Sequence, residues 1–325
     1  MRLGTMLGWL AAVSLAGAAC SSPNSGNPTG AGGGASVATG AGGGASVATG
    51  AGGGATVSTC DGLAKVVCDK LDACAPTVIA LAYGSVAHCS ERLALGLCAS
   101  SAGVDFAACG ADYATLSCDA IFASDSAPAG CVSTSAAADG APCGEDAECK
   151  SSHCVKGTDS ACGTCEAKVA AGGACGMVAQ VCASGFTCLA DTCTKLKPPG
   201  DACAATDECS GAHVCIGGKC GAPPTEGEAC TQDIRCSLFE ALYCSPKTNT
   251  CKAVGLANVG ESCGYDMAGD KVTLCKVSDC AADDKCVAPL KDGDACMTGP
   301  NQPSCEAPAE CLQGKCTPPM ADTCK

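Results

Sequence analysis

The sequence predicts a small disulfide-rich fold, in which a disulfide-stapled helical domain precedes tandem, knottin-like cysteine-rich repeats with little regular secondary structure. Three observations favour this class. The chain of 325 residues contains 35 cysteines, but only 3% of its residues are aromatic. Cysteines recur at nearly constant intervals in the C-terminal half, and at helical spacing before it. Such cysteine usage is typical of scaffolds in which cross-links replace a large apolar core, and it indicates an oxidising compartment.

The first segment, residues 1–19, is predicted to be an export signal. Its apolar run, Leu7–Ala16, is too short to span a bilayer as a helix. The following Leu-Ala-Gly-Ala-Ala-Cys resembles a bacterial lipoprotein box with Cys20 as the lipidated residue, although Gly17 stands where such boxes usually carry leucine. Ordinary signal cleavage after Ala18 is the alternative.

The surroundings of Cys20 bear on how the protein is anchored. Without Cys20, 34 cysteines remain, an even number that allows complete pairing. Two or three acyl chains would anchor the protein stably where one chain is marginal. Ser21 follows the cysteine, with no aspartate to retain the protein at the inner membrane. By resemblance to Gram-negative lipoproteins, this predicts the outer membrane or the cell surface.

Residues 20–59 are expected to combine the lipidated cysteine with a low-complexity tether. The sequence TGAGGGASVA occupies Thr29–Ala38 and Thr39–Ala48, and a near-identical third copy follows at Thr49–Ser58. Uncharged glycine, alanine, serine and threonine favour a flexible coil with a typical reach of about 35 Å. Neutral expansion of the repeat, without function, is the alternative.

Residues 60–131 are predicted to form three or four short helices held together by disulfides. Apolar residues recur there at the three-and-four spacing of amphipathic helices, and Asp61 suits the positive end of the first helix dipole. Eight cysteines allow four internal bridges. The three apolar faces are Leu63, Ala64, Val67, Cys68 and Leu71; Val86, Cys89, Leu93 and Leu97; and Phe106, Cys109, Tyr113 and Leu116. The cysteines are Cys60, Cys68, Cys74, Cys89, Cys98, Cys109, Cys118 and Cys131. Residues 132–139 are expected to be a linker.

Residues 140–325 are predicted to form about six repeats. Each begins with a marker glycine three residues before its first cysteine, and a turn with positive φ is expected there. The marker glycines are Gly140, Gly172, Gly200, Gly227, Gly260 and Gly293. In order of repeat, the cysteines are Cys143, Cys149, Cys154, Cys162 and Cys165; Cys175, Cys182, Cys188 and Cys193; Cys203, Cys209, Cys215 and Cys220; Cys230, Cys236, Cys244 and Cys251; Cys263, Cys275, Cys280 and Cys286; and Cys296, Cys305, Cys311 and Cys316. The first repeat has one surplus cysteine, and Cys324 is the other.

A repeat of roughly 30 residues cannot bury enough apolar surface to offset the entropy of ordering it. Two bridges per repeat, worth about 2–4 kcal/mol each, would take the place of the missing core. Four cysteines allow three pairings, and the sequence does not decide among them. Pairing the first with the third and the second with the fourth is favoured weakly, because crossed loops are longer.

The repeats resemble a known family. The G-x-x-C start, the C-x(5)-C spacing and the closing Gly218-Lys219-Cys220 and Gly314-Lys315-Cys316 are similar to Dickkopf N-terminal-type cysteine-rich repeats. Their tandem use behind a lipid anchor resembles myxobacterial-type cysteine-rich surface lipoproteins. The resemblance covers residues 140–325 and implies architecture and location, without a chemical activity.

No segment carries a strong signal for catalysis or metal binding. The one C-x-x-C, at Cys162 and Cys165, lacks the βαβ context of a redox motif and is expected to be structural. His88, His153 and His213 are scattered, which argues against zinc, and each is expected to be exposed. The acidic clusters before cysteines, such as Glu145–Cys149 and Asp292–Asp294, fit solvated charge better than calcium loops. No catalytic residue, metal ligand or cofactor is predicted.

The expected function is therefore that of a non-enzymatic cell-surface lipoprotein, a binding or adhesion module of the envelope. Its partners would be the membrane, through the lipid anchor, and a protein or polysaccharide ligand. The net charge of −14 argues against nucleic acid. A structural envelope component and an inhibitor of secreted proteases are the alternatives.

Overall fold

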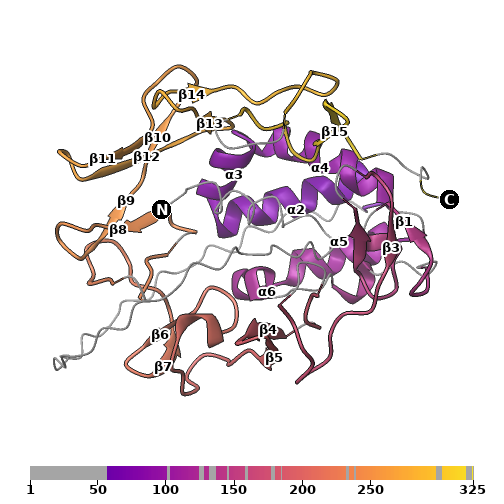
Figure 1. Ribbon diagram of the computed structural model, residues 1–325, viewed down its shortest axis with the longest axis horizontal. Helices are drawn as coiled ribbons and strands as arrows, with labels where there is room; N and C mark the ends of the chain where they lie inside the picture. The colour runs from indigo at the N-terminus through magenta and orange to yellow at the C-terminus, as the bar shows by residue number, and fades with distance from the viewer. Residues whose placement is uncertain are drawn as a thin grey trace.

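The computed structural model describes residues 57–324, apart from gaps at 101–102, 124–127, 132–136, 145, 158–159, 177–179, 184, 232–233, 238, 298–301 and 320–323. The predicted export signal, Cys20 and all but the end of the predicted tether lie outside the described residues. The fold class predicted from the sequence is confirmed: a disulfide-bonded helical region is followed by short strands in many small sheets, again with numerous disulfides (Figure 1).

The helical region has five helices within the described residues, where three or four were expected. The longest, α2 (Cys60–Cys74) and α4 (Val86–Ser100), pack against each other, and α5 (Phe106–Thr115) also lies against α2. The additional short helices are α3 (Pro76–Ala82) and α6 (Cys118–Ala123). Pro76 begins α3 because its missing N–H and fixed φ suit the first helical position.

The apolar faces predicted for the helices form the largest core of the protein. All five residues of the face predicted in α2 are buried, and Cys89, Leu93 and Leu97 of α4 join the same cluster. Thr59 caps α2 by accepting the Gly62 N–H, and Asp105 caps α5 by accepting two backbone N–H groups. Leu116 lies just beyond the end of α5.

Four disulfides staple these helices, and all of them stay within the helical region. They are Cys60–Cys98, Cys68–Cys89, Cys74–Cys118 and Cys109–Cys131. Two of them join α2 to α4, one joins α2 to α6, and the fourth ties α5 to the short 3-10 helix η1 (Ala129–Cys131). The eight cysteines therefore pair among themselves, in the manner that their even number allowed.

The repeats are built from β-hairpins of two to five residues per strand, each joined to short loops. The strands are β1 (Pro142–Cys143), β2 (Cys154–Lys156), β3 (Gly163–Cys165), β4 (Phe186–Leu189), β5 (Thr192–Lys195), β6 (Val214–Ile216), β7 (Lys219–Gly221), β8 (Leu242–Cys244), β9 (Cys251–Ala253), β10 (Gly255–Ala257), β11 (Gly264–Asp266), β12 (Lys271–Cys275), β13 (Asp279–Cys280), β14 (Cys286–Val287), β15 (Glu310–Leu312) and β16 (Lys315–Thr317). Two 3-10 helices, η2 (Asp146–Glu148) and η3 (Thr206–Glu208), precede the second cysteines of the first and third repeats.

In every repeat the disulfides are crossed, so that the first cysteine pairs with the third and the second with the fourth. For the first repeat, these bridges are Cys143–Cys154 and Cys149–Cys165, which leaves Cys162 outside the frame. The other frame bridges are Cys175–Cys188 and Cys182–Cys193; Cys203–Cys215 and Cys209–Cys220; Cys230–Cys244 and Cys236–Cys251; Cys263–Cys280 and Cys275–Cys286; and Cys296–Cys311 and Cys305–Cys316. The third and fourth cysteines face each other across the hairpin. The sulfurs of the third and fourth cysteines therefore lie on the same face of the hairpin, where they bond to the sulfurs of the first and second cysteines.

One backbone hydrogen bond recurs in every repeat, as the two frame disulfides do. The N–H of each marker glycine donates to the carbonyl of the fourth cysteine, over 2.7–2.9 Å in all six repeats. All six marker glycines have positive φ, between 74° and 90°, as predicted. In the second, third and sixth repeats, the hairpin turn has two consecutive residues with positive φ, such as Gln313 and Gly314. This is the type I′ geometry, which matches the twist of two-residue hairpins.

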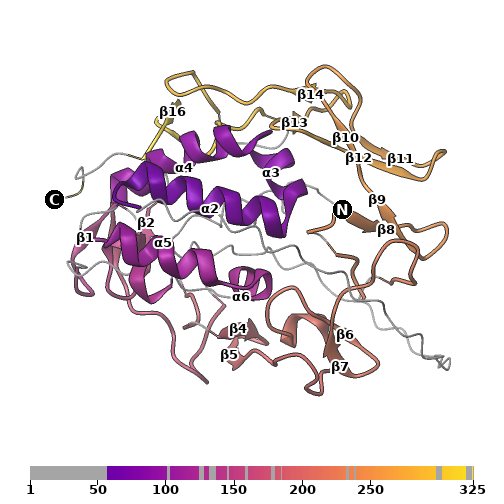
Figure 2. The same ribbon diagram turned by 180° about the vertical axis from the view of Figure 1, so that it is seen from behind.

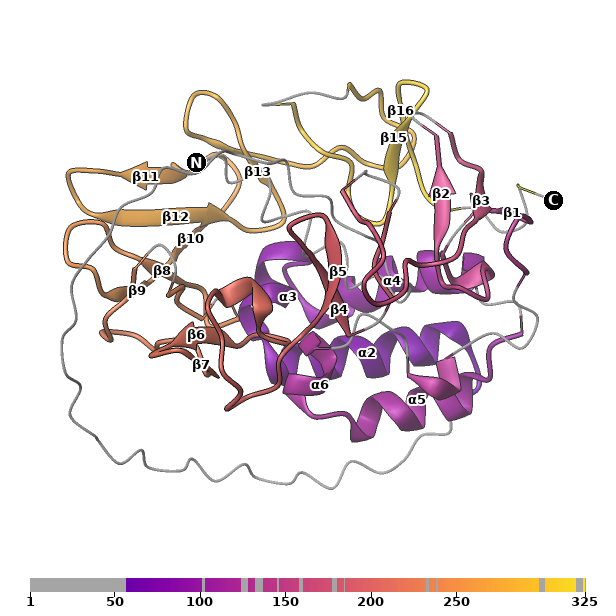
Figure 3. The same ribbon diagram turned by 60° about the horizontal axis from the view of Figure 1, so that its bottom comes forward.

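The six repeats encircle the helices instead of extending away from them. Figures 1 and 2 show the hairpins following one another around the helical region, from β1–β3 through β4–β9 to β10–β16. Figure 3 shows β15 and β16 beside β2 and β3, so that the last repeat returns to the first. The seventeenth disulfide, Cys162–Cys324, joins these two ends of the ring.

Candidate functional site

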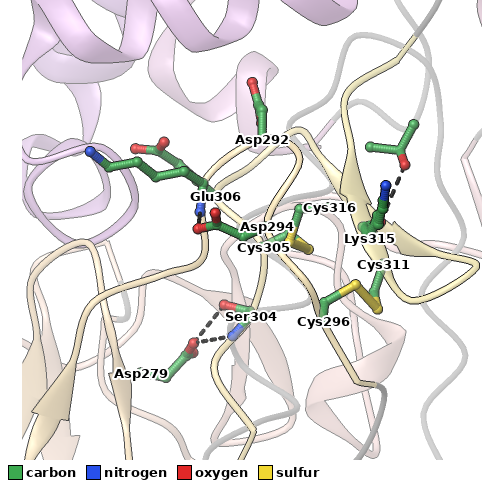
Figure 4. Close-up of a disulfide and its surroundings, with 12 residues drawn as sticks. Asp279, Asp292, Asp294, Cys296, Ser304, Cys305, Glu306, Cys311, Lys315 and Cys316 are labelled. Atoms are coloured by element: carbon green, nitrogen blue, oxygen red, sulfur yellow. Dashed lines mark hydrogen bonds between the residues drawn. A yellow bond between two sulfur atoms is a disulfide. The ribbon is translucent and has the colours of Figure 1, made fainter.

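The most strongly bonded contact between the ring and the helices is formed by α4 and the sixth repeat. Arg92 of α4 is only 6% exposed. Its guanidinium donates two hydrogen bonds to the Asp292 carboxylate, over 2.8 and 2.9 Å, and others to the carbonyls of Glu306 and Ala307. Figure 4 shows Asp292 and Glu306 of the sixth repeat together with its two disulfides, Cys296–Cys311 and Cys305–Cys316. The buried cation thus has a partner for most of its donors.

Charge complementarity stabilises this contact in its ionised form. The hydrogen bonds to Asp292 raise the pKa of Arg92, and the same bonds lower the pKa of Asp292. His88, one turn before Arg92, places its Nε2 atom 2.6 Å from the Glu306 carboxylate. We refer to Arg92, His88, Asp292 and Glu306 as the α4 clamp.

The fifth repeat also contacts the helical region. The Val277 N–H donates to the carbonyl of Leu81 in α3 over 2.7 Å. Gly84, in the turn after α3, has a φ of +74°, and a Cβ there would lie 2.8 Å from the Val277 side chain. A glycine is therefore required at this point for both the turn and the close approach.

The seam between the fourth and fifth repeats is organised by one buried carboxylate. Asp270 is 7% exposed and lies in the left-handed region with φ of 50°. It accepts hydrogen bonds from Lys252 and Ser245 of the fourth repeat, each over 2.6 Å, and from Tyr265 over 3.0 Å. The Tyr243 hydroxyl donates to its backbone carbonyl. The bonds from Lys252 and then Ser245 lower the pKa of Asp270 to about 2.

The seam between the fifth and sixth repeats uses a second carboxylate. Asp279 accepts hydrogen bonds from both the backbone N–H and the hydroxyl of Ser304, over 2.7 and 2.6 Å (Figure 4). The fourth, fifth and sixth repeats are therefore joined in series by side-chain hydrogen bonds as well as by the chain itself.

The C-x-x-C pair does not form its own bridge. Cys165 belongs to the frame of the first repeat, whereas Cys162 pairs with Cys324 across a sequence separation of 162 residues. Both of its half-cystines are therefore held in separate structural bridges. In the frames of the first five repeats, three sulfurs lie within 4.8 Å of one another, a spacing that a metal site also requires. Because all of these sulfurs are in disulfides, they lack the thiolate that metal binding needs.

The structure corrects the expectation that the histidines are exposed. His153 is 6% exposed, and His88 and His213 are half-buried. His88 belongs to the α4 clamp, while the Nδ1 atom of His213 lies 2.9 Å from the Ser210 carbonyl. The three remain far apart in sequence and serve different local contacts.

The carboxylates of the acidic clusters make more structural contacts than solvated surface charges, which were expected, would make. Asp292 holds Arg92, and Asp294 accepts the Lys291 N–H within its own turn. The carboxylate after the marker glycine makes the same turn contact in the fourth and fifth repeats, through Glu228 and Glu261. Asp146 accepts the Cys154 N–H, and burial raises its pKa. Sequence reasoning missed these roles, although an acidic residue after a marker glycine was a signal for the turn contact.

Exposed apolar side chains are concentrated in one stretch of the sequence. Within the described residues, five of the seven exposed large apolar side chains lie between positions 256 and 297, in or beside the fifth and sixth repeats. The most exposed are Met267 at 74% and Met297 at 68%. Both lie between the first and second cysteines of their repeats, a segment whose length varies while the frame stays constant. We call Leu256, Val259, Tyr265, Met267 and Met297 the apolar loop residues; Leu256 and Tyr265 lie in the short strands β10 and β11, and the other three lie in loops.

The geometry defines a class of protein: a disulfide-rich protein with tandem cysteine-rich repeats, whose extensive bridging indicates export to an oxidising compartment. Within the described residues, no helix is both long enough and apolar enough to cross a membrane. Comparison with protein families, curated proteins and solved structures gave no match to the chain.

Proposed function

We propose that the protein is a non-enzymatic cell-surface lipoprotein, anchored through Cys20, that acts as a binding or adhesion module of the outer envelope. The observation that carries the proposal is the combination of a constant disulfide frame with first-to-second cysteine segments of variable length. Variable loops on a rigid scaffold are where binding residues are usually found. The resemblance to myxobacterial-type surface lipoproteins with Dickkopf N-terminal-type repeats supports the location.

Within this proposal, the ligand is a protein rather than a polysaccharide. Of the apolar loop residues only Tyr265 is aromatic, and its hydroxyl is already bonded to Asp270. The two most exposed are methionines, whose flexible, polarisable side chains suit adaptable protein contacts. Display beyond a tether favours weak, multivalent adhesion between neighbouring cells.

Cell adhesion tests the proposal directly. Cells carrying the full-length protein are compared with deletion cells and with cells carrying Met267→Ser together with Met297→Ser. We expect adhesion to fall on deletion and in the double variant, because both exposed apolar side chains are lost. Leu95→Ser, at a 37% exposed position of α4, is the matched control and should leave adhesion unchanged. If deletion has no effect and the purified protein binds neither envelope, matrix nor itself, the proposal is wrong.

A structural role in the envelope is the second candidate, and the covalent closure of the ring favours it. Cys162–Cys324 joins the two ends of the six repeats, and the frame bridges cross-link each repeat within itself. Such a molecule would resist proteolysis and mechanical load. High abundance in the outer membrane, together with an ectodomain that associates only with itself, would support this role over adhesion to a partner.

A further inference from the structure

The Cys162–Cys324 bridge differs from the other sixteen in what it connects. The four helical bridges stay within the helical region, and the twelve frame bridges stay within their repeats, at separations of 11–17 residues. Cys162–Cys324 spans 162 residues and joins the first repeat to the segment that follows the sixth. Cys324 also places its sulfur 3.5 Å from the Ala161 carbonyl and against Gly144.

Its removal would leave every repeat with a complete frame. Cys143–Cys154 and Cys149–Cys165 hold the first repeat without Cys162, and Cys296–Cys311 and Cys305–Cys316 hold the sixth. The α4 clamp would still attach the sixth repeat to the helices. The bridge is therefore an addition to a fold that is already cross-linked.

Its two cysteines are also more accessible than those of most frames. Both are half-buried, whereas each second-to-fourth frame bridge has at least one buried cysteine, such as Cys165 or Cys316. A thiolate must approach a disulfide sulfur to attack it, so access governs the rate of exchange. Four other bridges have one exposed cysteine, namely Cys60–Cys98, Cys74–Cys118, Cys175–Cys188 and Cys263–Cys280. The first two tie helices, and in the other two the exposed Cys188 and Cys280 lie in hairpin strands. After reduction, packed helices and paired strands hold such sulfurs near their partners and favour closure again.

Cys162 and Cys324, by contrast, both lie outside helices and strands. We propose that the Cys162–Cys324 bond is a redox latch, which a dithiol reductant opens while the other bridges stay closed. One thiolate of the dithiol attacks a sulfur of the bond, forming a mixed disulfide, and the other cysteine leaves as a thiolate that takes up a proton. The second thiol of the reductant then displaces the remaining cysteine. Two electrons pass from the dithiol, which becomes a disulfide, to the bridge, which becomes two thiols.

The latch acts on the seam where the ring closes. While it is closed, the Cys324 sulfur lies beside the Ala161 carbonyl and against Gly144 of the first repeat. Once it is open, Cys324 is no longer held there, and the backbone around Gly144 becomes available to solvent or partners. The helices and the six frames keep their structure.

Stepwise reduction of the full-length protein tests this directly. Dithiothreitol is added at increasing concentration, free thiols are alkylated, and each cysteine is located by peptide mass spectrometry. We expect Cys162 and Cys324 to be labelled together at a concentration about tenfold below that needed for any frame cysteine. Hydrogen exchange of the Gly144 N–H, beside which the Cys324 sulfur lies, should accelerate at that concentration. Earlier or simultaneous labelling of the frames, or unchanged exchange at Gly144, would overturn the proposal.

Two double variants separate the latch from general loss of a bridge. Cys162→Ser with Cys324→Ser should show the faster exchange at Gly144 without reductant, and its remaining bridges should stay unlabelled over the same range. Cys203→Ser with Cys215→Ser removes a frame bridge whose cysteines are likewise half-buried. It should accelerate exchange in β6 and β7 of the third repeat and leave exchange at Gly144 unchanged. Equal behaviour of the two variants would refute a specific latch.

Discussion

At the scale of single residues, the protein depends on cysteines and on glycines with positive φ. Every cysteine that the structure describes is in a disulfide, and many of them are fully buried where a larger protein would have leucine or phenylalanine. Each marker glycine turns the chain so that its N–H reaches the fourth cysteine. The turn and the bridges together position the hairpin, which explains why both recur in all six repeats.

Replacing a marker glycine should therefore lower the free energy of unfolding, and the loss should come from backbone strain alone. Gly227 has a φ of +84°, and a Cβ there would meet no atom within 4 Å. We expect Gly227→Ala to lower the free energy of unfolding by about 1–2 kcal/mol, because an L-residue is strained in this region. Gly221 has equally open surroundings without positive φ, so Gly221→Ala is the control and should lose much less. Guanidinium denaturation of the oxidised proteins measures both, and equal losses would contradict the explanation.

The Asp270 carboxylate makes the seam between the fourth and fifth repeats sensitive to acid. Its pKa in the folded protein is about 2, below the ordinary value of 3.8, so the ionised form is favoured by folding. The stabilisation is present in full above pH 3.8 and is lost as the pH falls towards 2. We expect hydrogen exchange of β8, β9 and β12 to accelerate over this window. Asp270→Asn tolerates the same φ and should remove the pH dependence; an unchanged acid response in this variant would contradict the assignment.

At the scale of elements, the helices serve as the support around which the repeats are arranged. Arg92 and His88 of α4 bind the sixth repeat, and the turn after α3 receives Val277 of the fifth. The apolar cluster beneath α2 and α4 fixes the position of these contacts. Among the described residues, the helical region is thus the one part with an ordinary apolar core, and it orients repeats whose small clusters consist mostly of cysteines.

Loss of the α4 clamp should loosen the sixth repeat. We expect Arg92→Met to lower its local stability by about 2–3 kcal/mol, because Asp292 and two carbonyls lose charge-assisted donors. Lys65→Met breaks an exposed ion pair with Asp69 and should change stability by less than about 0.5 kcal/mol. Hydrogen exchange of β15 and β16 reports the effect. Unaltered exchange in the Arg92 variant would mean that the clamp does not hold the repeat.

Much of this architecture could be predicted from the sequence, because it is encoded locally. The three-and-four spacing from Leu63 to Leu71 gave the buried face of α2, and the glycine before Cys143 gave the turn of the first repeat. The crossed pairing was favoured but left open, since all three pairings satisfy the same spacing. The short helix α3 and the roles of Arg92 and Asp270 could not be predicted, because they depend on contacts between segments up to about 200 residues apart.

At the scale of the whole molecule, six repeats form a ring around the helices, and one bridge closes it (Figure 3). The sequence predicted repeats in series and did not predict that they curve back, although the two surplus cysteines, one in the first repeat and Cys324 after the last, were a sign of the closure. The exposed apolar loop residues belong to the fifth and sixth repeats or to the chain just before the fifth. The proposed adhesion would thus use these two repeats of a molecule with a net charge of −14.

The central claim is that disulfides, in place of an apolar interior, fix the shape of this ring after export. Peptide mapping of the mature protein, alkylated without reduction, tests it most directly. We expect no labelled cysteine in the native protein and linked peptides for the crossed frame pairs and for Cys162–Cys324. Many accessible thiols in the native protein, or metal ions held by them, would contradict the account.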